Sequence, residues 1–185
     1  MALLLLINKV AAVLIILGQV AILLLLSHLF LYRKQNRVFA FVKKNGLVLA
    51  FIVALFSFAD SIFYSQVAGF APCQLCWWQR IFMYPLTVIL AVALLKKPLR
   101  ARGDFGVVDY ALSLAIVGAA ISVYHNYVYF YNGGLSATCQ VLGGSVSCFQ
   151  KYVSEFGYVT IPVMALTAFT LIITCLIFSK FKQHD

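Results

Sequence analysis

The chain has 185 residues, of which 64% are hydrophobic and 10% are charged, and its mean hydropathy is +0.99. Soluble domains contain roughly 45–50% apolar residues, so a water-soluble fold of this length could not bury so much apolar surface, and a bilayer is the predicted environment. The net charge of +9 does not indicate a nucleic-acid-binding protein, because the basic residues lie in short runs between hydrophobic segments.

Five segments are long and apolar enough to cross a bilayer, which takes about 20 residues in a helix. In chain order they are Val10–Tyr32, Gly46–Tyr64, Trp77–Leu95, Val107–Tyr131 and Tyr158–Ser179. The third is the weakest because it contains Arg80 and Pro85, but the two tryptophans at its start are typical of a headgroup boundary. The sequence therefore predicts an all-α integral membrane protein.

The positions of the basic residues predict the orientation, because cytoplasmic loops carry an excess of Lys and Arg. Most of them lie in the loop after the first span, the loop after the third span and the C-terminal tail: Arg33, Lys34, Arg37, Lys43, Lys44, Lys96, Lys97, Arg100, Arg102, Lys180 and Lys182. These segments are predicted to be cytoplasmic, and loops 65–76 and 132–157 to face outward. The first span is expected to be a retained anchor, since its apolar run exceeds that of a signal peptide.

This topology sorts the five cysteines. Cys73, Cys76, Cys139 and Cys148 fall in the outward loops or at their edges, whereas Cys175 lies within the last span. An even set of four on an oxidising face favours two disulfide-forming pairs. Cys175 is expected to be an ordinary small apolar side chain.

Cys73 and Cys76 form a Cys-x-x-Cys motif directly before the third span. At a helix start, unpaired backbone N–H groups and the helix dipole favour the thiolate, which is the reactive form in disulfide exchange. The motif therefore predicts a redox-active pair. Haem attachment is disfavoured because Trp77 follows the second cysteine. A four-cysteine zinc site is disfavoured because Cys139 and Cys148 are too widely spaced, and no metal is expected.

The second pair, Cys139 and Cys148, closes a ten-residue segment rich in glycine and serine. Taken alone, this segment is equally consistent with a structural disulfide, which would stabilise it by roughly 2–4 kcal/mol. Beside a reactive Cys-x-x-Cys on the same face, an exchange-active pair is favoured. Two dithiols on one face can pass electrons between them.

Polar side chains within the outer leaflet are candidate ligand-binding groups. Arg80 follows Cys76 by about one helical turn on the same face, and a guanidinium in a span indicates a functional site unless it only snorkels to the headgroups. His125 lies at a similar depth, where an interhelical hydrogen bond is the alternative role. Asp60 could neutralise Arg80. The aromatic residues around His125 are interpreted as an interfacial belt: Tyr124, Tyr127, Tyr129, Phe130 and Tyr131.

A redox-active dithiol at the membrane needs an electron acceptor. The sequence has no flavin fingerprint, haem ligand pair or iron–sulfur cysteine set. A lipophilic quinone fits instead, because it accepts the two electrons that a dithiol supplies and its carbonyl oxygens require donors such as Arg80.

Several of these segments resemble the disulfide bond formation protein B (DsbB) family, and especially its BdbC-like branch. The similarity covers about residues 46–180 and is carried by the outer cysteine pair and by three segments: residues 72–85 (PCQLCWWQRIFMYP), 124–126 (YHN) and 156–162 (FGYVTIP). Residues 1–45 then form an extra N-terminal helix and cytoplasmic loop, and residues 181–185 a cytoplasmic tail.

The resemblance implies a four-helix transmembrane bundle in the bacterial cytoplasmic (inner) membrane, preceded by one extra helix. Members of the DsbB family reoxidise a DsbA/BdbD-like thioredoxin-fold protein and pass the electrons to a quinone (ubiquinone or menaquinone), and the resemblance implies the same activity here. On this pattern Cys139 forms the mixed disulfide with the partner and Cys148 completes that pair. Cys73 and Cys76 receive the electrons, with Cys76 nearest the quinone, while Arg80 and His125 border the quinone.

The chain departs from the family pattern in its extra first span and in its short second cysteine loop, which leaves open which cysteine of that loop meets the partner. Two other functions are considered. A vitamin K epoxide reductase-like protein also couples membrane dithiols to a quinone, but there the Cys-x-x-Cys pair comes late in the chain. A non-enzymatic membrane subunit would use both disulfides only to brace its loops.

Overall fold

The computed structural model describes residues 2–31, 37–95, 105–131 and 152–181, and it is helical over most of them. Helix α1 spans Ala2–Leu31, α2 Arg37–Ile62, α3 Gln74–Leu95, α5 Phe105–Tyr131 and α7 Ile161–Phe181. Helix α2 continues into a π-helical turn, η1, over Phe63–Val67. Five helices in this part of the chain are long and apolar enough to cross a membrane. The prediction of an all-α integral membrane protein is confirmed.

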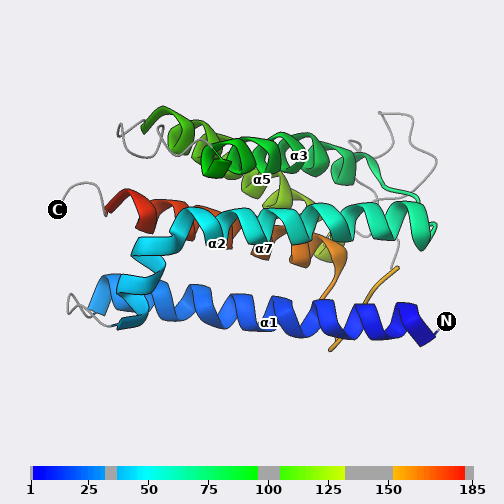
Figure 1. The fold of residues 1–185 in the computed structure, drawn as a ribbon. Helices are drawn as coiled ribbons and strands as arrows, with labels where there is room; N and C mark the ends of the chain where they lie inside the picture. Colours follow the sequence, from blue (N-terminus) through cyan, green and yellow to red (C-terminus); the bar gives the residue numbers. More distant parts are fainter. Residues whose placement is uncertain (1, 32–36, 96–104, 132–151, 182–185) are drawn as a thin grey trace.

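The helices α2, α3, α5 and α7 form a four-helix bundle, and α1 is added to it. Both α3 and α7 pack against α2 and α5, while α1 packs against α7. Successive helices run in opposite directions, so α1 begins and α7 ends at opposite ends of the bundle (Figure 1). The starts of α3 and α7 and the end of α5 therefore share one end, which is also the end where α1 begins.

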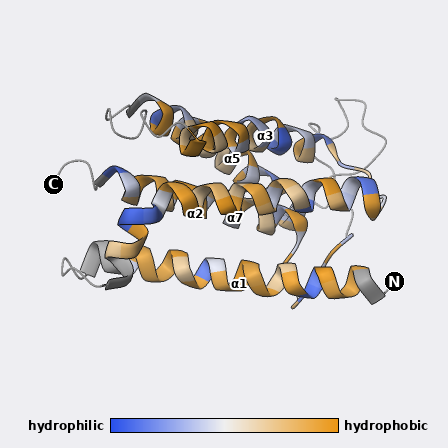
Figure 2. Ribbon diagram, in the orientation of Figure 1, coloured by the Kyte–Doolittle hydropathy of each residue, from blue (hydrophilic) through white to orange (hydrophobic). Residues whose placement is uncertain are grey.

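The outer surface of the bundle is apolar. Hydrophobic residues dominate along all five helices (Figure 2). Large aliphatic side chains such as Leu23, Val88 and Val123 are exposed on it. In water such a surface would be a liability, whereas hydrocarbon tails cover it without cost. Polar backbone groups are satisfied within the helices, as a bilayer requires.

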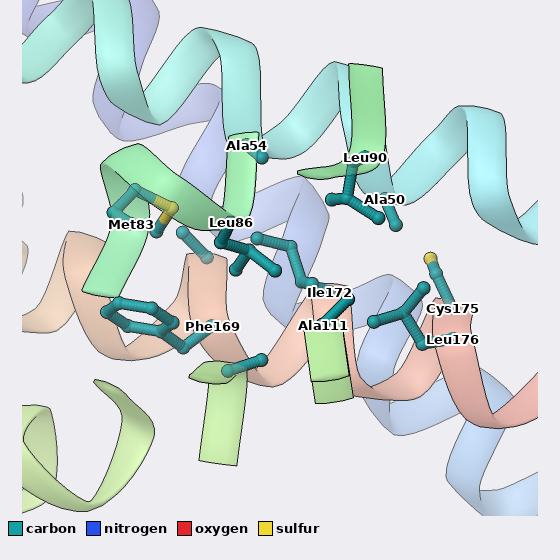
Figure 3. Close-up of a cluster of buried hydrophobic side chains, with 12 residues drawn as sticks. Ala50, Ala54, Met83, Leu86, Leu90, Ala111, Phe169, Ile172, Cys175 and Leu176 are labelled. Atoms are coloured by element: carbon teal, nitrogen blue, oxygen red, sulfur yellow. The ribbon is translucent and has the colours of Figure 1, made fainter. Parts of the chain in front are cut away.

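The bundle core is built from small residues on two helices and larger ones on the others (Figure 3). Ala50 and Ala54 of α2 and Ala111 of α5 let the backbones approach closely. The space is filled by side chains from α3 and α7: Met83, Leu86, Leu90, Phe169, Ile172, Cys175 and Leu176. Cys175 is 3% exposed within this cluster, which confirms that it packs as a small apolar side chain.

All five helix starts differ from the predicted spans, α3 and α5 by only three and two residues. Helix α1 begins at Ala2 and α2 at Arg37, because polar residues near their ends did not interrupt the helices. Helix α7 begins at Ile161, later than predicted. Just before it, Glu155 and Val159 exchange two backbone hydrogen bonds of 3.1 and 3.0 Å in an isolated bridge. Gly157, with φ of 80°, adopts the left-handed conformation that this tight turn needs.

Close approach of α2 and α7 at Gly46 gives a testable prediction. A Cβ atom at Gly46 would lie 2.5 Å from the carbonyl oxygen of Cys175, which is backbone and cannot rotate away. We expect Gly46→Ala to destabilise the protein by about 1–3 kcal/mol, as overpacking does, measured by thermal unfolding in detergent. The control is Gly106→Ala, whose Cβ would meet only Tyr110 at 3.7 Å. Equal melting temperatures for the two variants would contradict the close contact.

Candidate functional site

A cavity of about 150 Å³ lies at the end of the bundle where α3 begins. All five helices and η1 contribute residues to its wall, including Ile15 of α1. Much of the wall is apolar, but a group of polar and sulfur-containing side chains also lines it: Asp60, Cys73, Cys76, Arg80, His125 and Tyr129.

The Cys-x-x-Cys motif forms the start of α3. Cys73 precedes the first helical residue, and its carbonyl oxygen accepts the hydrogen bond from the Trp77 N–H at 3.1 Å. The Cys73 Sγ in turn accepts from the backbone N–H of Cys76 at 3.4 Å. Cys73 is thus the N-cap of the helix, with sulfur in the place of the usual cap oxygen. One of the N–H groups that the sequence predicted to face the motif, that of Cys76, is therefore directed at its sulfur.

The two thiols of the motif lie side by side and contact a histidine. The Sγ atoms of Cys73 and Cys76 are 3.0 Å apart, and both are free thiols. The Nε2 atom of His125, on α5, lies 3.7 Å from the Cys73 Sγ. His125 is 1% exposed, so it meets Cys73 in the interior of the bundle, on the cavity wall.

This environment changes the acidity of Cys73, which lies just before the membrane-spanning part of α3. The hydrogen bond from the Cys76 thiol lowers the pKa of Cys73 most strongly. Burial opposes this effect, while the hydrogen bond and charge of His125 add to it. The net result is a pKa of Cys73 well below that of an ordinary thiol, so the thiolate is the stable form of this sulfur at neutral pH.

The lowered pKa of Cys73 predicts an unusual pH dependence of alkylation. A depressed pKa keeps the thiolate populated as the pH falls, so the iodoacetamide rate at Cys73 should be nearly unchanged between pH 8 and pH 6. A free thiol with a pKa of about 8.5 loses almost a hundredfold over this range. The rate is followed by mass spectrometry on the reduced, chelator-treated protein. In His125→Gln the rate should fall more steeply with pH, and a tenfold loss per pH unit in the unsubstituted protein would refute the assignment.

Arg80 is held on the cavity wall by the end of α2. Its Nε donates to Ser61 Oγ at 2.8 Å and its Nη2 to the Ser61 carbonyl oxygen at 3.0 Å. The guanidinium carbon also lies 5.4 Å from the centre of the Trp77 ring, a cation–π contact. Asp60 lines the same cavity, but in the part of the chain described here it forms no ion pair with Arg80. Asp60 therefore does not pair with the guanidinium that lies beside the dithiol.

Four of the predicted site residues meet at the cavity, namely Cys73, Cys76, Arg80 and His125. Cys139 and Cys148 lie outside the described residues. The described chain leaves α5 at Tyr131 and resumes at Tyr152, which lines the cavity.

Several cavity residues were missed by the sequence reasoning. Tyr129 was interpreted as part of an interfacial belt, but it lines the cavity. It follows His125 by four residues, and that spacing on one helix face is the signal that could have found it. Tyr64 could not have been found in this way, because its position depends on the π-helical turn and on a contact with α1. Its hydroxyl donates to Asn8 Oδ1 at 2.9 Å, and both side chains are buried.

Aromatic rings connect Tyr64, on the cavity wall, to Tyr152, which follows the segment that contains Cys139 and Cys148. Tyr64 stacks on Phe70 with ring centroids 5.8 Å apart, and Phe70 stacks on Tyr152 at 4.6 Å. Phe70 precedes Cys73 by three residues. The stack therefore connects the approach to the Cys-x-x-Cys motif with residue 152.

Asn126, next to His125, ties α5 to the start of α7. Its Nδ2 donates to the carbonyl oxygen of Pro162 at 2.9 Å and to that of Ser122 at 2.8 Å. The segments 124–126 and 156–162, which carry part of the family resemblance, are thus in direct contact. This contact joins α5 to the start of α7 one residue after His125.

These features define a class of protein. A vicinal dithiol at a helix start, enclosed by membrane-spanning helices and next to a histidine, an arginine and a cavity, is a membrane-embedded thiol site. Its sulfur atoms are close enough to form a disulfide after a small side-chain rotation.

Comparison with known proteins assigns the family. The model described as "Disulfide bond formation protein DsbB" matches residues 43–179. Disulfide bond formation protein C of Bacillus subtilis (strain 168) is 41% identical over 145 residues, covering 77% of this chain and 99% of that protein. The probable disulfide formation protein of Metapseudomonas resinovorans is 42% identical over 137 residues, covering 72% and 88%. No solved structure gives a significant match.

The chain belongs to the DsbB family, and it is a multi-pass membrane protein with a disulfide oxidoreductase role. The SPbeta prophage-derived disulfide bond formation protein B of Bacillus subtilis (strain 168) is a further relative, 36% identical over 129 residues that cover 70% of this chain and 81% of that protein. The family assignment therefore favours a DsbB-like protein over the vitamin K epoxide reductase-like protein that was the alternative enzyme. Helix α1 lies before the residues that the family model matches.

Proposed function

We propose that the protein reoxidises a DsbA/BdbD-like thioredoxin-fold protein and passes the electrons to a membrane quinone. The observation that carries this proposal is that the dithiol of Cys73 and Cys76 and the cationic side chain of Arg80 line one cavity between membrane-spanning helices. An electron acceptor in that cavity would touch both the electron source and a hydrogen-bond donor.

The residues of the cavity suit a quinone. Phe169, Met83 and Ile15 supply apolar walls for a ring that is dissolved in lipid, and Arg80 and Tyr129 supply donors for its carbonyl oxygens. Of the five guanidinium N–H groups, two are directed at Ser61 in the described residues. When bound, a quinone accepts two electrons and two protons from a dithiol, which leaves a disulfide and a quinol.

The protein's own residues prepare this exchange. His125 and the Cys76 thiol stabilise the Cys73 thiolate, and the thiolate is the species that takes part in disulfide exchange. Cys76 follows the cap position by three residues and lies on the side of α3 that carries Arg80 one turn later. We therefore assign Cys76 to the quinone side of the pair.

The second pair completes the proposed electron path. Cys139 is proposed to form the mixed disulfide with the partner and Cys148 to resolve it, after which the electrons pass to Cys73 and Cys76. The chain leaves α5 and re-enters at Tyr152 at the end of the bundle where α3 begins, which supports exchange between the pairs. The basic loops favour an orientation in which the cysteines face the extracytoplasmic side, and membership of the DsbB family supports a location in the bacterial inner membrane.

A reconstituted assay tests this function. The purified protein is mixed with a reduced thioredoxin-fold partner and a soluble quinone analogue, and thiol loss and quinone absorbance are followed together. We expect one quinone reduced for every two partner thiols lost, over many turnovers. If both cysteine pairs stay oxidised and the quinone is not consumed, the disulfides only brace the loops and the proposal is wrong.

Helix α1 is expected to affect quinone binding through the buried contact between Asn8 and Tyr64. Asn8→Leu leaves the Tyr64 hydroxyl without its acceptor, at a cost of about 1–3 kcal/mol. We expect the Tyr64 ring to leave its position in the cavity wall as a result. The KM for quinone should then rise about three- to tenfold, with little change in the rate at which the partner is oxidised.

The matched control for this prediction is Gln19→Leu. Gln19 joins α1 to Thr167 and Tyr158 through hydrogen bonds of 3.2 and 3.0 Å, and it does not line the cavity. An equal rise in KM for both variants would show that general docking of α1, and not the Tyr64 contact, is responsible.

A further inference from the structure

Three potential metal ligands meet at the start of α3. Among the described residues, the Sγ atoms of Cys73 and Cys76 and a ring nitrogen of His125 all lie within 4.8 Å of one another. We propose that the reduced site binds one Zn²⁺ ion through these three side chains, and that the bound ion holds the pair in its dithiolate form. This proposal concerns the reduced state alone and requires neither the quinone nor the partner.

The observed distances are close to those of a tetrahedral zinc site. Bond lengths of about 2.3 Å to sulfur and about 2.0 Å to nitrogen place two sulfur ligands about 3.8 Å apart and a sulfur and a nitrogen about 3.5 Å apart. The Cys73 Sγ lies 3.7 Å from His125 Nε2, which already fits. The two sulfur atoms are 3.0 Å apart, so one of them must move outward by less than 1 Å, which a small rotation of the Cys76 side chain achieves.

The surroundings satisfy the other requirements of the site. Two thiolates neutralise the charge of the ion, and imidazole with thiolate is a donor set that zinc prefers. All three side chains line the cavity, which leaves the fourth coordination position open to water. Arg80 opposes a cation here, but its guanidinium is held toward Ser61.

The chemistry of binding is an exchange of protons for metal, without oxidation. Zn²⁺ displaces the protons that remain on the two sulfur atoms, so that each sulfur donates a lone pair to the ion and keeps its electrons. The pair cannot form a disulfide while both lone pairs are engaged. Zinc is therefore expected to inhibit turnover by trapping the reduced state, and a chelator to restore it.

Cobalt provides the test, since a sulfur-to-cobalt charge-transfer band reports thiolate ligands directly. The experiment uses full-length protein in detergent, reduced and anaerobic, with Cys139→Ser and Cys148→Ser to remove the second pair. We expect one equivalent of Co²⁺ to produce the band and one equivalent of Zn²⁺ to remove it. Cys175→Ser should leave the titration unchanged, whereas Cys76→Ser should abolish the band and His125→Gln should weaken Co²⁺ binding at least tenfold.

X-ray absorption of the zinc-loaded protein gives a second measurement that needs no histidine variant. Two sulfur ligands and an imidazole nitrogen in the zinc shell are expected. The proposal is overturned if the reduced protein gives no cobalt band, if the band persists in Cys76→Ser, or if the zinc shell contains no imidazole. None of these outcomes bears on electron transfer to quinone, which is measured separately and without added metal.

Discussion

Replacing Cys76 by serine is expected to abolish quinone reduction, lowering the rate by at least a hundredfold. The Cys76 Sγ lies 3.0 Å from that of Cys73, and in the proposed mechanism the two electrons leave the protein only when these two atoms join. Serine is nearly isosteric but cannot form a disulfide, so the variant should fold and still exchange with the partner through the second pair. The measurement is the steady-state rate of quinone absorbance loss with a reduced partner.

Cys175→Ser is the matched control for this prediction. Cys175 is likewise a free thiol, but it is buried in the bundle core and does not line the cavity. Its substitution should leave the rate of quinone reduction unchanged after correction for any loss of folded protein. A Cys76→Ser protein that reduces quinone at the unsubstituted rate would mean that the electrons leave by another route.

Much of the fold follows from composition and spacing. In a bilayer only helices satisfy their own backbone groups, so five long apolar segments sufficed to predict five helices. The helix ends were harder to place. Arg37 lies within α2, and Asn8 and Lys9 within α1, because a polar residue near a membrane surface ends the apolar segment without ending the helix. The late start of α7 depends on the turn at Gly157, which hydropathy does not report.

The site was predictable to the extent that its residues are neighbours along one helix. The relation of Cys76 to Arg80 follows from helical periodicity alone. The contact between His125 and Cys73, by contrast, depends on how α5 is rotated against α3, and the anchoring of Arg80 depends on Ser61 from α2. These are tertiary contacts between residues far apart in sequence, and no local pattern specifies them. For Arg80, the sequence therefore left two roles open, ligand binding and snorkelling to the headgroups, because the contact with Ser61 could not be predicted.

The second large effect is expected from Arg80→Ala, which should raise the KM for quinone at least tenfold while the disulfides still form. A hydrogen bond to a charged group contributes about 1.5–3 kcal/mol, and alanine removes the guanidinium together with its contact to Trp77. Arg80→Lys should give an intermediate KM, because an ammonium group keeps the charge but cannot reproduce the planar fork. The measurement is quinone dependence at saturating reduced partner.

Ser61→Ala separates the role of Arg80 as a ligand donor from its position. This variant removes the hydroxyl that accepts from Arg80 Nε but keeps the backbone oxygen that accepts from Nη2, so the guanidinium stays at the cavity and loses only part of its anchoring. The KM should then rise about two- to threefold, the effect of losing one hydrogen bond of about 0.5 kcal/mol. If Arg80→Ala leaves the KM unchanged, the guanidinium interacts with lipid headgroups, and the donor for the quinone must be sought among the other polar residues of the cavity, beginning with Tyr129.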